Sequence, residues 1–377
     1  MNASTGSELL DAVGTAAHAV HALASGPLGV TIGVTTGSGT RIKSVGAADG
    51  NHRALHTDTR FDIASVTKVV ATTTAIHRLT SVGVLRLDDR VDRFVADSPC
   101  TSDATISTLL THRAGLWEWQ PLYLAPSADG RPVDAYQAVA ALPLRYPPVE
   151  RRAYSDLGFI LLGRIIERAT GLSLAEAVSE FVTGPLGLVD TAYGPVTGDV
   201  AASAPGDGVE RDMVRSGDPY PVLYPSREIA WRTHELTGEV NDGNCYRVLG
   251  GVSGHAGMFS TAVDLLRLGR SLALAATSDD LWRPAITAQI FDEGPDAGHA
   301  LGWRTTPDLL GGVRRNLLWH PGFTGCALGL VPGTGVALVL LSNRLMSAAP
   351  LPTAQLWATA LSSLGVSDAP MLIGSRP

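Results

Sequence analysis

The sequence predicts an α+β fold: an antiparallel sheet flanked by helices, built from both ends of the chain, and a mainly helical lobe built from its middle. Two observations predict it. Runs of β-branched residues lie near both ends, whereas helical patterns dominate between them. The chain also has 377 residues, of which 45% are hydrophobic and 17% charged, which is enough apolar sequence for a large core.

The first elements expected are a helix and a hairpin. Residues 1–26 have a polar start followed by an amphipathic helical pattern. Residues 28–36 and 41–47 are predicted strands, because β-branched residues flank the glycine-rich residues 37–39. Residues 61–63 are predicted to follow as a short strand or turn.

Helical patterns fill the middle of the chain, and each has a start or end signal. Residues 66–81 are a predicted helix that ends before Gly83, and residues 106–111 are a second that ends near Gly115. Residues 156–169 are a third, with Ser155 or Asp156 as N-cap and Gly171 just beyond its end. Residues 173–182 begin with a Ser173/Glu176 capping box, and a further helix begins at Thr261 and Asp264. Residues 195–225 are rich in Gly, Pro, Asp and Ser, and are predicted to form a long surface loop.

The last elements are predicted strands at residues 323–331 and 335–342 and a closing helix at residues 353–364. We expect the first and last strands to join one sheet. The sheet lobe would then comprise residues 1–75 and 275–377, and the helical lobe residues 76–274. We expect the active site to lie between the two lobes.

Composition argues against several partners. The net charge is −7 and no block of basic residues occurs, so we expect no nucleic-acid partner. The longest apolar stretch, residues 326–341, is interrupted by Pro332 and Gly333, so we expect no membrane contact. The three cysteines lack disulfide or zinc spacing, and the N-terminal residues include Glu8 and Asp11 but no basic region typical of a signal peptide. We therefore expect a cytoplasmic protein.

Motifs for cofactors are missing from the sequence. It contains no G-x-x-x-x-G-K, no G-x-G-x-x-G after a strand and no H-E-x-x-H, so we expect neither a cofactor nor a metal. The hydrolase pattern G-x-S-x-G is nearly met around Ser253, but His255 stands where the second glycine should be.

Ser65 and Lys68 form the first candidate catalytic pair. Of the 29 basic residues only Lys43 and Lys68 are lysines, and arginine cannot give up its proton near neutral pH. Residues three apart share a helix face, so the Ser65 hydroxyl can meet the Lys68 amine. A serine needs such a neighbour, as base or relay, to become a nucleophile. Taken alone, the spacing is also compatible with chance.

Tyr154 and Asp156 lie at the start of a predicted helix. A Tyr154 hydroxyl directed at Ser65 would shuttle a proton if the Lys68 cation favoured its deprotonated form. Taken alone, Tyr154 is more typical of a half-buried aromatic residue and Asp156 of a helix cap.

The sequence His320-Pro321-Gly322 precedes the last predicted hairpin. A glycine here lets a substrate approach the backbone, and the Phe323 N–H would form an oxyanion hole with the Ser65 N–H. Taken alone, this segment is also compatible with a simple turn.

Together, in the order S-x-x-K, Y-S-D and H-P-G, these motifs resemble those of the serine β-lactamase and penicillin-binding-protein superfamily. The similar branch contains class C β-lactamases, family VIII esterases, and transesterase and transacylase relatives. The sequences FDIASVTK around Ser65, LLTHRAGL at residues 109–116, GHAGMFST at residues 254–261 and HPGFTG at residues 320–325 also resemble family segments. The resemblance covers about residues 25–345.

The resemblance implies a β-lactamase/transpeptidase-like fold and a set of roles. Ser65 would be the acylated nucleophile, Lys68 its helper base or relay, and Tyr154 the proton shuttle. The Ser65 and Phe323 N–H groups would form the oxyanion hole. His320 and Gly322 would flank the substrate.

Two departures from the family pattern change the expected chemistry. Asp156 replaces an asparagine, and its carboxylate near Lys68 and the substrate would favour the lysine cation and move the base role to Tyr154. His320 and Pro321 replace the lysine and threonine of K-T-G, so recognition of a penicillin carboxylate should suffer. Trp117, with Trp119 and Tyr123, is predicted either to wall the substrate cleft or to pack in the lobe core.

These residues predict a serine acyl-transfer enzyme. It would form an acyl-Ser65 intermediate from a small-molecule ester and pass the acyl group to an amine, an alcohol or water, as an esterase or a transacylase of natural-product metabolism. A β-lactamase or D,D-peptidase is the second hypothesis. A non-catalytic ligand sensor with the same fold is the third.

Overall fold

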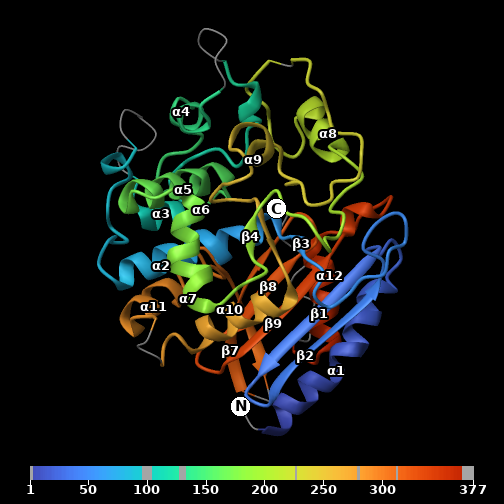
Figure 1. The fold of residues 1–377 in the computed structure, drawn as a ribbon. Helices are drawn as coiled ribbons and strands as arrows, with labels where there is room; N and C mark the ends of the chain where they lie inside the picture. The colour runs from blue at the N-terminus through green and yellow to red at the C-terminus, as the bar shows by residue number, and fades with distance from the viewer. Residues whose placement is uncertain are drawn as a thin grey trace.

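The computed structural model describes residues 3–95, 104–126, 133–225, 227–277, 281–310 and 313–366, so Cys100 lies outside the described residues. It confirms the α+β prediction. A six-stranded antiparallel sheet lies beside a group of helices that gather to one side of it, as Figure 1 shows.

Both ends of the chain contribute to this sheet, as the sequence predicts. The strand order is β2-β1-β9-β8-β7-β6, so the first hairpin pairs with the last strand. The strands are β1 (Gly29–Thr36), β2 (Gly39–Gly46), β6 (Arg304–Leu310), β7 (Val313–Pro321), β8 (Ala327–Val331) and β9 (Val336–Ser342). A small second sheet has the order β3-β5-β4 and contains β3 (Phe61–Asp62), β4 (Ala192–Tyr193) and β5 (Met258–Ser260).

Helices α1 and α12 pack on one face of the large sheet and α10 on the other, and further helices fill the middle of the chain. The α-helices are α1 (Ala3–His21), α2 (Thr74–Ser81), α3 (Ile106–Leu110), α4 (Ala135–Ala140), α5 (Asp156–Thr170), α6 (Leu174–Val178), α7 (Gly184–Leu186), α8 (Gly208–Ser216), α9 (Gly243–Val248), α10 (Ala262–Leu274), α11 (Pro284–Phe291) and α12 (Thr353–Ser363). Short 3-10 or π segments are η1 (Ala64–Val66), η2 (Lys68–Thr73), η3 (Val91–Arg93), η4 (Leu122–Leu124), η6 (Ser179–Thr183) and η7 (Arg344–Met346).

The central strand β9 separates two apolar cores, because successive side chains of a strand point to opposite faces. Leu338 and Leu340 join the core formed with α1 and α12, which includes Trp357. Val339 joins the larger core, to which α10 contributes Leu265. This larger core continues into the helical region, where α5 is buried along most of its length.

The proposed boundaries between the lobes stay a prediction. Helix α10 lies within residues 76–274, which the sequence places in the helical lobe, and it packs on β1, β8 and β9 of the sheet. Its N-cap is Thr261, whose side chain accepts from the Asp264 N–H, as predicted.

The described chain also departs from three sequence expectations. Residues 195–225 contain helix α8 and are therefore more than a surface loop. The helix expected at residues 66–81 is divided into η1, η2 and α2, with a wider π turn directly after the nucleophile candidate. Strands β6 and β7 were not expected, because the sequence RTTPDLL of β6 lacks an alternating apolar pattern.

Candidate active site

Ser65 follows a backbone turn that the small sheet holds in place. Strand β3 ends at Asp62, and the Asp62 side chain accepts from the Ala64 N–H at 2.7 Å and from the Asn241 N–H at 2.7 Å. Ala64 has a φ of 44°, a conformation that costs a non-glycine residue about 1–3 kcal/mol. The strained residue directly precedes Ser65, and both residues line a large cavity of about 420 Å³.

Lys68 is completely buried beside Ser65. Its Nζ donates to Ser65 Oγ at 2.9 Å and to the His255 carbonyl oxygen at 3.1 Å, and it lies 2.6 Å from Asp156 Oδ1. An ammonium group has three protons to donate, and these three acceptors match them. The S-x-x-K spacing therefore does bring the serine and the lysine together, and Asp156 joins them.

The charge state of Lys68 follows from these contacts. Burial, the largest single influence, would lower the pKa of Lys68, but Asp156 and Tyr154 together outweigh burial and leave the pKa raised. Lys68 is therefore an ammonium near neutral pH. It cannot accept the Ser65 proton in that state, and the expectation that the base role falls to Tyr154 stays a prediction.

Tyr154 is held against Lys68 by the segment that leads into α5. The Lys68 Nζ lies 5.1 Å from the centre of the Tyr154 ring, so the ammonium faces the tyrosine side chain. On either side of Tyr154, the Ala153 N–H donates to the His112 carbonyl and the Ser155 N–H to His112 Nδ1, both at 2.9 Å. The Ser155 side chain caps α5 by accepting from the Gly158 N–H.

His112 thus positions Tyr154, although the sequence identified it only as part of the LLTHRAGL segment. Its ring centre lies 4.6 Å from that of Tyr154. Burial keeps the pKa of His112 well below its usual value, and Arg152 and Lys68 add to the effect. The ring is therefore neutral, with a lone pair on Nδ1 for the Ser155 N–H.

Gly322 brings the predicted oxyanion donors together. A Cβ atom at this position would lie 2.4 Å from the Ile63 carbonyl oxygen, so only glycine allows the end of β7 to pack this close to the nucleophile turn. Phe323 follows, and Ser65, Gly322 and Phe323 all line the large cavity. Within the described residues, the Phe323 N–H donates to no protein acceptor, as expected for an oxyanion donor.

The large cavity has a volume of about 420 Å³. Five of the predicted site residues line it, namely Ser65, Tyr154, Asp156, Gly322 and Phe323. Much of its wall is apolar. The apolar and aromatic lining residues include Trp119, Val209, Met213, Pro219, Tyr220, Trp319, Pro321, Phe323 and Leu345. The wall formed by residues 204–220 belongs to the segment that the sequence predicted to be a surface loop.

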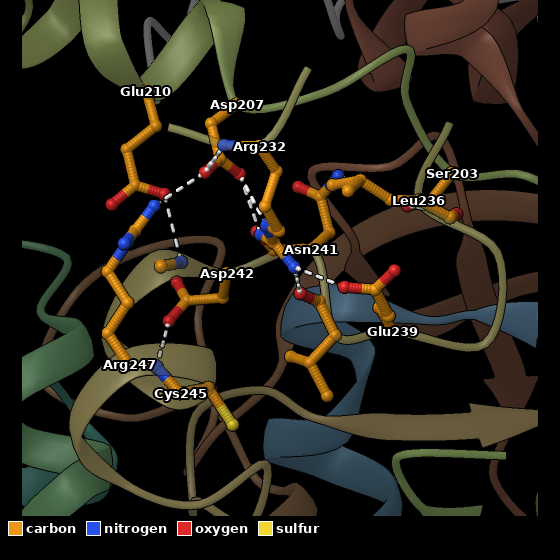
Figure 2. A network of polar contacts seen from close by, with 12 residues as sticks. Ser203, Asp207, Glu210, Arg232, Leu236, Glu239, Asn241, Asp242, Cys245 and Arg247 are labelled. Atoms are coloured by element: carbon orange, nitrogen blue, oxygen red, sulfur yellow. Dashed lines mark hydrogen bonds and ion pairs between the residues drawn. The ribbon is translucent and has the colours of Figure 1, made fainter. Parts of the chain in front are cut away.

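A polar network forms another part of this wall. Figure 2 shows the Arg232 and Arg247 side chains converging on Asp207, with Glu210 and Asp242 nearby. Glu210 accepts from the Tyr123 hydroxyl at 2.5 Å and from the Gly243 N–H at 2.9 Å. Burial and the Asp242 charge raise the pKa of Glu210 to about 8. Tyr123 therefore contacts Glu210, which lines the cavity. Sequence analysis did not identify Glu210 as a site residue.

A family model described as Beta-lactamase matches residues 16–360 of the chain. The chain belongs to the β-lactamase family. A curated relative, a putative D-alanyl-D-alanine carboxypeptidase of Escherichia coli (strain K12), is 31% identical over 313 residues, covering 76% of this chain and 70% of the relative.

Two solved structures confirm the β-lactamase-like fold. A class C β-lactamase from Rhodobacter sphaeroides aligns with a TM-score of 0.63 and 20% identity, covering 96% of this chain and 98% of that one. EstCE1, described as a hydrolase with promiscuous acyltransferase activity, aligns with a TM-score of 0.65 and 20% identity, covering 96% and 98%. The family model confirms the superfamily predicted from the motifs.

Two residues of this β-lactamase-family protein that were predicted to contact substrate, His320 and Trp117, do not line the large cavity. His320 is 2% exposed and does not line the large cavity; its ring centre lies 6.1 Å from that of Tyr154. Burial keeps the pKa of His320 well below its usual value, with Lys68 adding to the effect, so it does not replace a lysine cation. Trp117 also lies outside the lining: its Nε1 donates to the Pro143 carbonyl, and Arg145 lies over its ring.

His255 of the GHAGMFST segment belongs to a second cluster, which it forms with Ser253 and Asp242. His255 Nδ1 lies 2.7 Å from Ser253 Oγ, and His255 Nε2 lies 3.0 Å from Asp242 Oδ1. Ser253 and His255 are each 1% exposed, and Ser253 does not line the cavity. The cluster fixes the loop whose His255 carbonyl accepts from Lys68.

Other classes of site receive no support from the described part of the chain. It contains no group of three or more His, Cys, Asp or Glu side chains placed to hold a metal ion. Among its helices, none is both long and apolar enough to span a bilayer. The cysteines it contains, Cys245 and Cys326, are buried and unpaired.

Proposed function

We propose that this protein is a serine hydrolase that cleaves a small amide, peptide or ester through an acyl-Ser65 intermediate. The observation that carries the proposal is the contact set of Lys68, whose ammonium joins Ser65, Tyr154 and Asp156 at one end of the large cavity. The Asp156 carboxylate holds the proton on Lys68, so the base role falls to Tyr154.

In the proposed reaction, Ser65 Oγ attacks the substrate carbonyl carbon while its proton passes to the Tyr154 phenolate. The carbonyl oxygen takes the negative charge between the Ser65 and Phe323 N–H groups. Tyr154 then gives the proton to the leaving amine or alcohol as the acyl–leaving-group bond breaks. Water then attacks the acyl carbon while Tyr154 accepts its proton. Tyr154 returns that proton to Ser65 Oγ as the bond between Oγ and the acyl carbon breaks, and the acid is released.

As the first substrate class we propose a short peptide that ends in a D-amino acid with a free carboxylate. The E. coli relative bears the name of a putative carboxypeptidase for such peptides. A carboxylate in the cavity would also meet positive charge at Arg344, whose side chain donates to the Phe323 and Leu351 carbonyls and lines the wall. The cytoplasmic location stays a prediction, and it matters here because cell-wall peptides occur outside the cytoplasm.

Transfer of the acyl group to an amine or alcohol is the second candidate. The apolar wall formed by Trp119, Met213, Trp319 and Leu345 favours this outcome, because an organic acceptor would bind there in competition with water. The ester and amide donors proposed above serve both reactions, and only the acceptor differs.

Intact-mass analysis with a serine-reactive fluorophosphonate and a substrate panel tests both candidates. We expect the fluorophosphonate to label Ser65 and expect turnover of peptides ending in D-Ala-D-Ala and of small methyl esters. Faster decay of the acyl-enzyme with an added amine would favour transfer, and faster turnover of nitrocefin than of either substrate would favour a β-lactamase. Stoichiometric acylation without turnover would favour a ligand sensor, and the absence of any acylation would contradict the proposal.

A further inference from the structure

Asp156 presents one carboxylate oxygen to the large cavity. Its Oδ1 is buried and lies 2.6 Å from Lys68 Nζ. Within the described part of the chain, its Oδ2 accepts from no protein group, although the side chain is 17% exposed and lines the cavity. The backbone at this position is fixed, because the Asp156 N–H donates to the Glu118 carbonyl at 2.8 Å. Oδ2 is therefore the oxygen that Asp156 offers to a substrate.

A carboxylate selects for one kind of partner, because it can only accept hydrogen bonds. Asp156 Oδ2 attracts a donor on the substrate, such as an amino group, and repels a carbonyl oxygen. The asparagine of the family pattern could contact either kind of group, since a side-chain amide both donates and accepts. The exchange of this amide for a carboxylate therefore narrows the choice of substrate to molecules with a donor near Asp156.

This acceptor lies close to the reacting centre. Lys68 Nζ lies 2.9 Å from Ser65 Oγ and 2.6 Å from Asp156 Oδ1, so one ammonium group connects the nucleophile to the carboxylate. In an acyl group derived from an amino acid, the nitrogen is attached to the carbon next to the carbonyl that Ser65 attacks. The α-amino group is therefore the substrate donor that can approach Asp156 Oδ2 while the carbonyl faces Ser65.

The Lys68 cation would repel a substrate ammonium if no other charge opposed it. Asp156 is the first carboxylate that acts on Lys68. Asp242, which also lines the cavity, is the second: burial alone would raise its pKa, but His255 and Lys68 help to hold that pKa lowered. Two carboxylates therefore oppose the Lys68 charge, which leaves Oδ2 of Asp156 open to a cationic amine.

We propose that Asp156 is a specificity-determining residue, which selects substrates with a free amino group beside the scissile carbonyl. Together with the substrate carboxylate that would meet Arg344, this makes the substrate class a free dipeptide instead of the end of a longer peptide. The inference rests on the proposed function, because it names the acyl group that Ser65 receives. An N-acylated peptide is disfavoured, since it has no ammonium and its additional carbonyl oxygen would face the carboxylate.

The test compares D-Ala-D-Ala with N-acetyl-D-Ala-D-Ala at pH 7. The two peptides share the scissile bond, the leaving group and the carboxylate, and only the first has a free amine, which is mostly charged at this pH because its pKa is about 8. We expect kcat/KM to be about 10- to 100-fold higher for the free dipeptide, as for a hydrogen bond between charged groups. In Asp156→Asn this preference should shrink by about tenfold or more. Any effect of the substitution on Lys68 acts on both peptides and cancels in the ratio.

Glu210→Gln is the matched control, because it exchanges another carboxylate of the same cavity wall for an amide. Both oxygens of Glu210 already have partners, the Tyr123 hydroxyl and the Gly243 N–H. The preference for the free dipeptide should therefore equal that of the wild type. A preference that disappears in Glu210→Gln and persists in Asp156→Asn would overturn the inference, since the amine would then bind at the other wall.

Calorimetry on Ser65→Ala provides a measurement that needs no turnover. This variant should bind D-Ala-D-Ala more tightly than the N-acetyl peptide, and Ser65→Ala/Asp156→Asn should lose most of that difference. If neither peptide acylates the wild type, the proposed function fails, while the binding difference still tests Asp156. Equal or tighter binding of the N-acetyl peptide by Ser65→Ala would overturn the inference, and so would a difference that survives without Asp156. Thermal melts identify a double variant that fails to fold, and the Ser65→Ala comparison then decides.

Discussion

Two clusters in this protein each contain a serine, a nitrogen-bearing side chain and a carboxylate, and Lys68 contacts both. In the first, Lys68 Nζ lies between Ser65 Oγ and Asp156 Oδ1. In the second, His255 lies between Ser253 Oγ and Asp242 Oδ1, and the His255 carbonyl accepts from Lys68. The second cluster has the residue types of a serine protease triad, yet Ser65 lines the large cavity and Ser253 does not.

The difference shows that residue types alone do not identify a nucleophile. Ser253 is 1% exposed, so a substrate carbonyl cannot reach its hydroxyl. Ser65 faces 420 Å³ of space and lies beside Phe323, whose N–H has no protein acceptor among the described residues. We infer that the second cluster serves the first, because its hydrogen bonds fix one of the three acceptors of Lys68.

The largest expected effect separates the two serines directly. Ser65→Ala should abolish fluorophosphonate labelling and reduce kcat by about 10⁴-fold or more, since it removes the atom that forms the acyl-enzyme. Ser253→Ala should keep kcat within about tenfold, with a loss of stability of about 1 kcal/mol for one buried hydrogen bond. Rates and labelling of both variants check this, and a dead Ser253→Ala that still folds would reverse the assignment.

Lys68→Arg replaces the side chain that contacts both clusters. An arginine is larger and planar, and it cannot place one donor on Ser65, Asp156 and the His255 carbonyl at the same time. We expect kcat/KM to fall by about 10³-fold. Steady-state rates measure the loss, and circular dichroism serves as the control for folding. Activity within about tenfold of the wild type would contradict the role given to Lys68.

Asp156→Asn tests the electrostatic part of the comparison. Asp156 raises the pKa of Lys68, so its removal should lower that pKa. If catalysis needs the Lys68 ammonium, activity is lost as pH rises through the lysine pKa, and the alkaline limb of kcat/KM should therefore move to lower pH in the variant. We expect a change of about tenfold at pH 9. An alkaline limb that stays in place would show that the Lys68 charge is not required.

The sequence predicted most of the first cluster, because the contacts in it are local or belong to ordered motifs. Ser65 and Lys68 are three residues apart, and Tyr154 and Asp156 stand at a helix start with a clear N-cap. The position of Asp156 beside Lys68 also followed, since its carboxylate replaces a neutral amide at a known motif position. The same reasoning failed for His320: its motif position implied substrate contact, but packing turned it away from the large cavity.

The rest of the site depends on contacts between distant parts of the chain. Arg304 lies on a strand without an alternating pattern, and Glu210 lies on a short helix within a segment rich in turn residues. Neither has a sequence signal, because each becomes part of the site only when α8 and β6 pack around the cavity. His255 was noted as a mismatch in a hydrolase pattern and as part of the GHAGMFST segment, but neither observation predicts its contact with Asp242, 13 residues away.

His255→Gln weakens the second cluster without removing the carbonyl that Lys68 uses. Glutamine cannot reach Ser253 and Asp242 together, so the loop should become less well fixed and stability should fall by about 1–3 kcal/mol. We expect kcat to fall about threefold to tenfold while KM stays within twofold. Kinetics and denaturant melts measure both quantities, with Ser253→Ala as the milder comparison. A loss as large as that of Lys68→Arg would give His255 a direct catalytic role.

Glu210→Gln has the smallest expected effect, which is on stability alone. It probes the pKa of Glu210, which depends on the charge of Asp242, the carboxylate of the second cluster. Burial and the Asp242 charge raise the pKa of Glu210 to about 8 from 4.5. The folded state therefore binds a proton more tightly than the unfolded state, and stability falls as pH rises between those values, by at most about 1.4 kcal/mol per pH unit. Asp62, whose pKa burial raises to about 6, adds a similar slope only below pH 6.

Glutamine keeps both contacts of a protonated Glu210, because its oxygen can accept from Gly243 and its amide can donate to Tyr123. Melting temperatures between pH 6 and 8 should therefore fall less steeply in the variant than in the wild type, and parallel curves would show that Glu210 is ionised throughout and does not share a proton-dependent contact with Asp242.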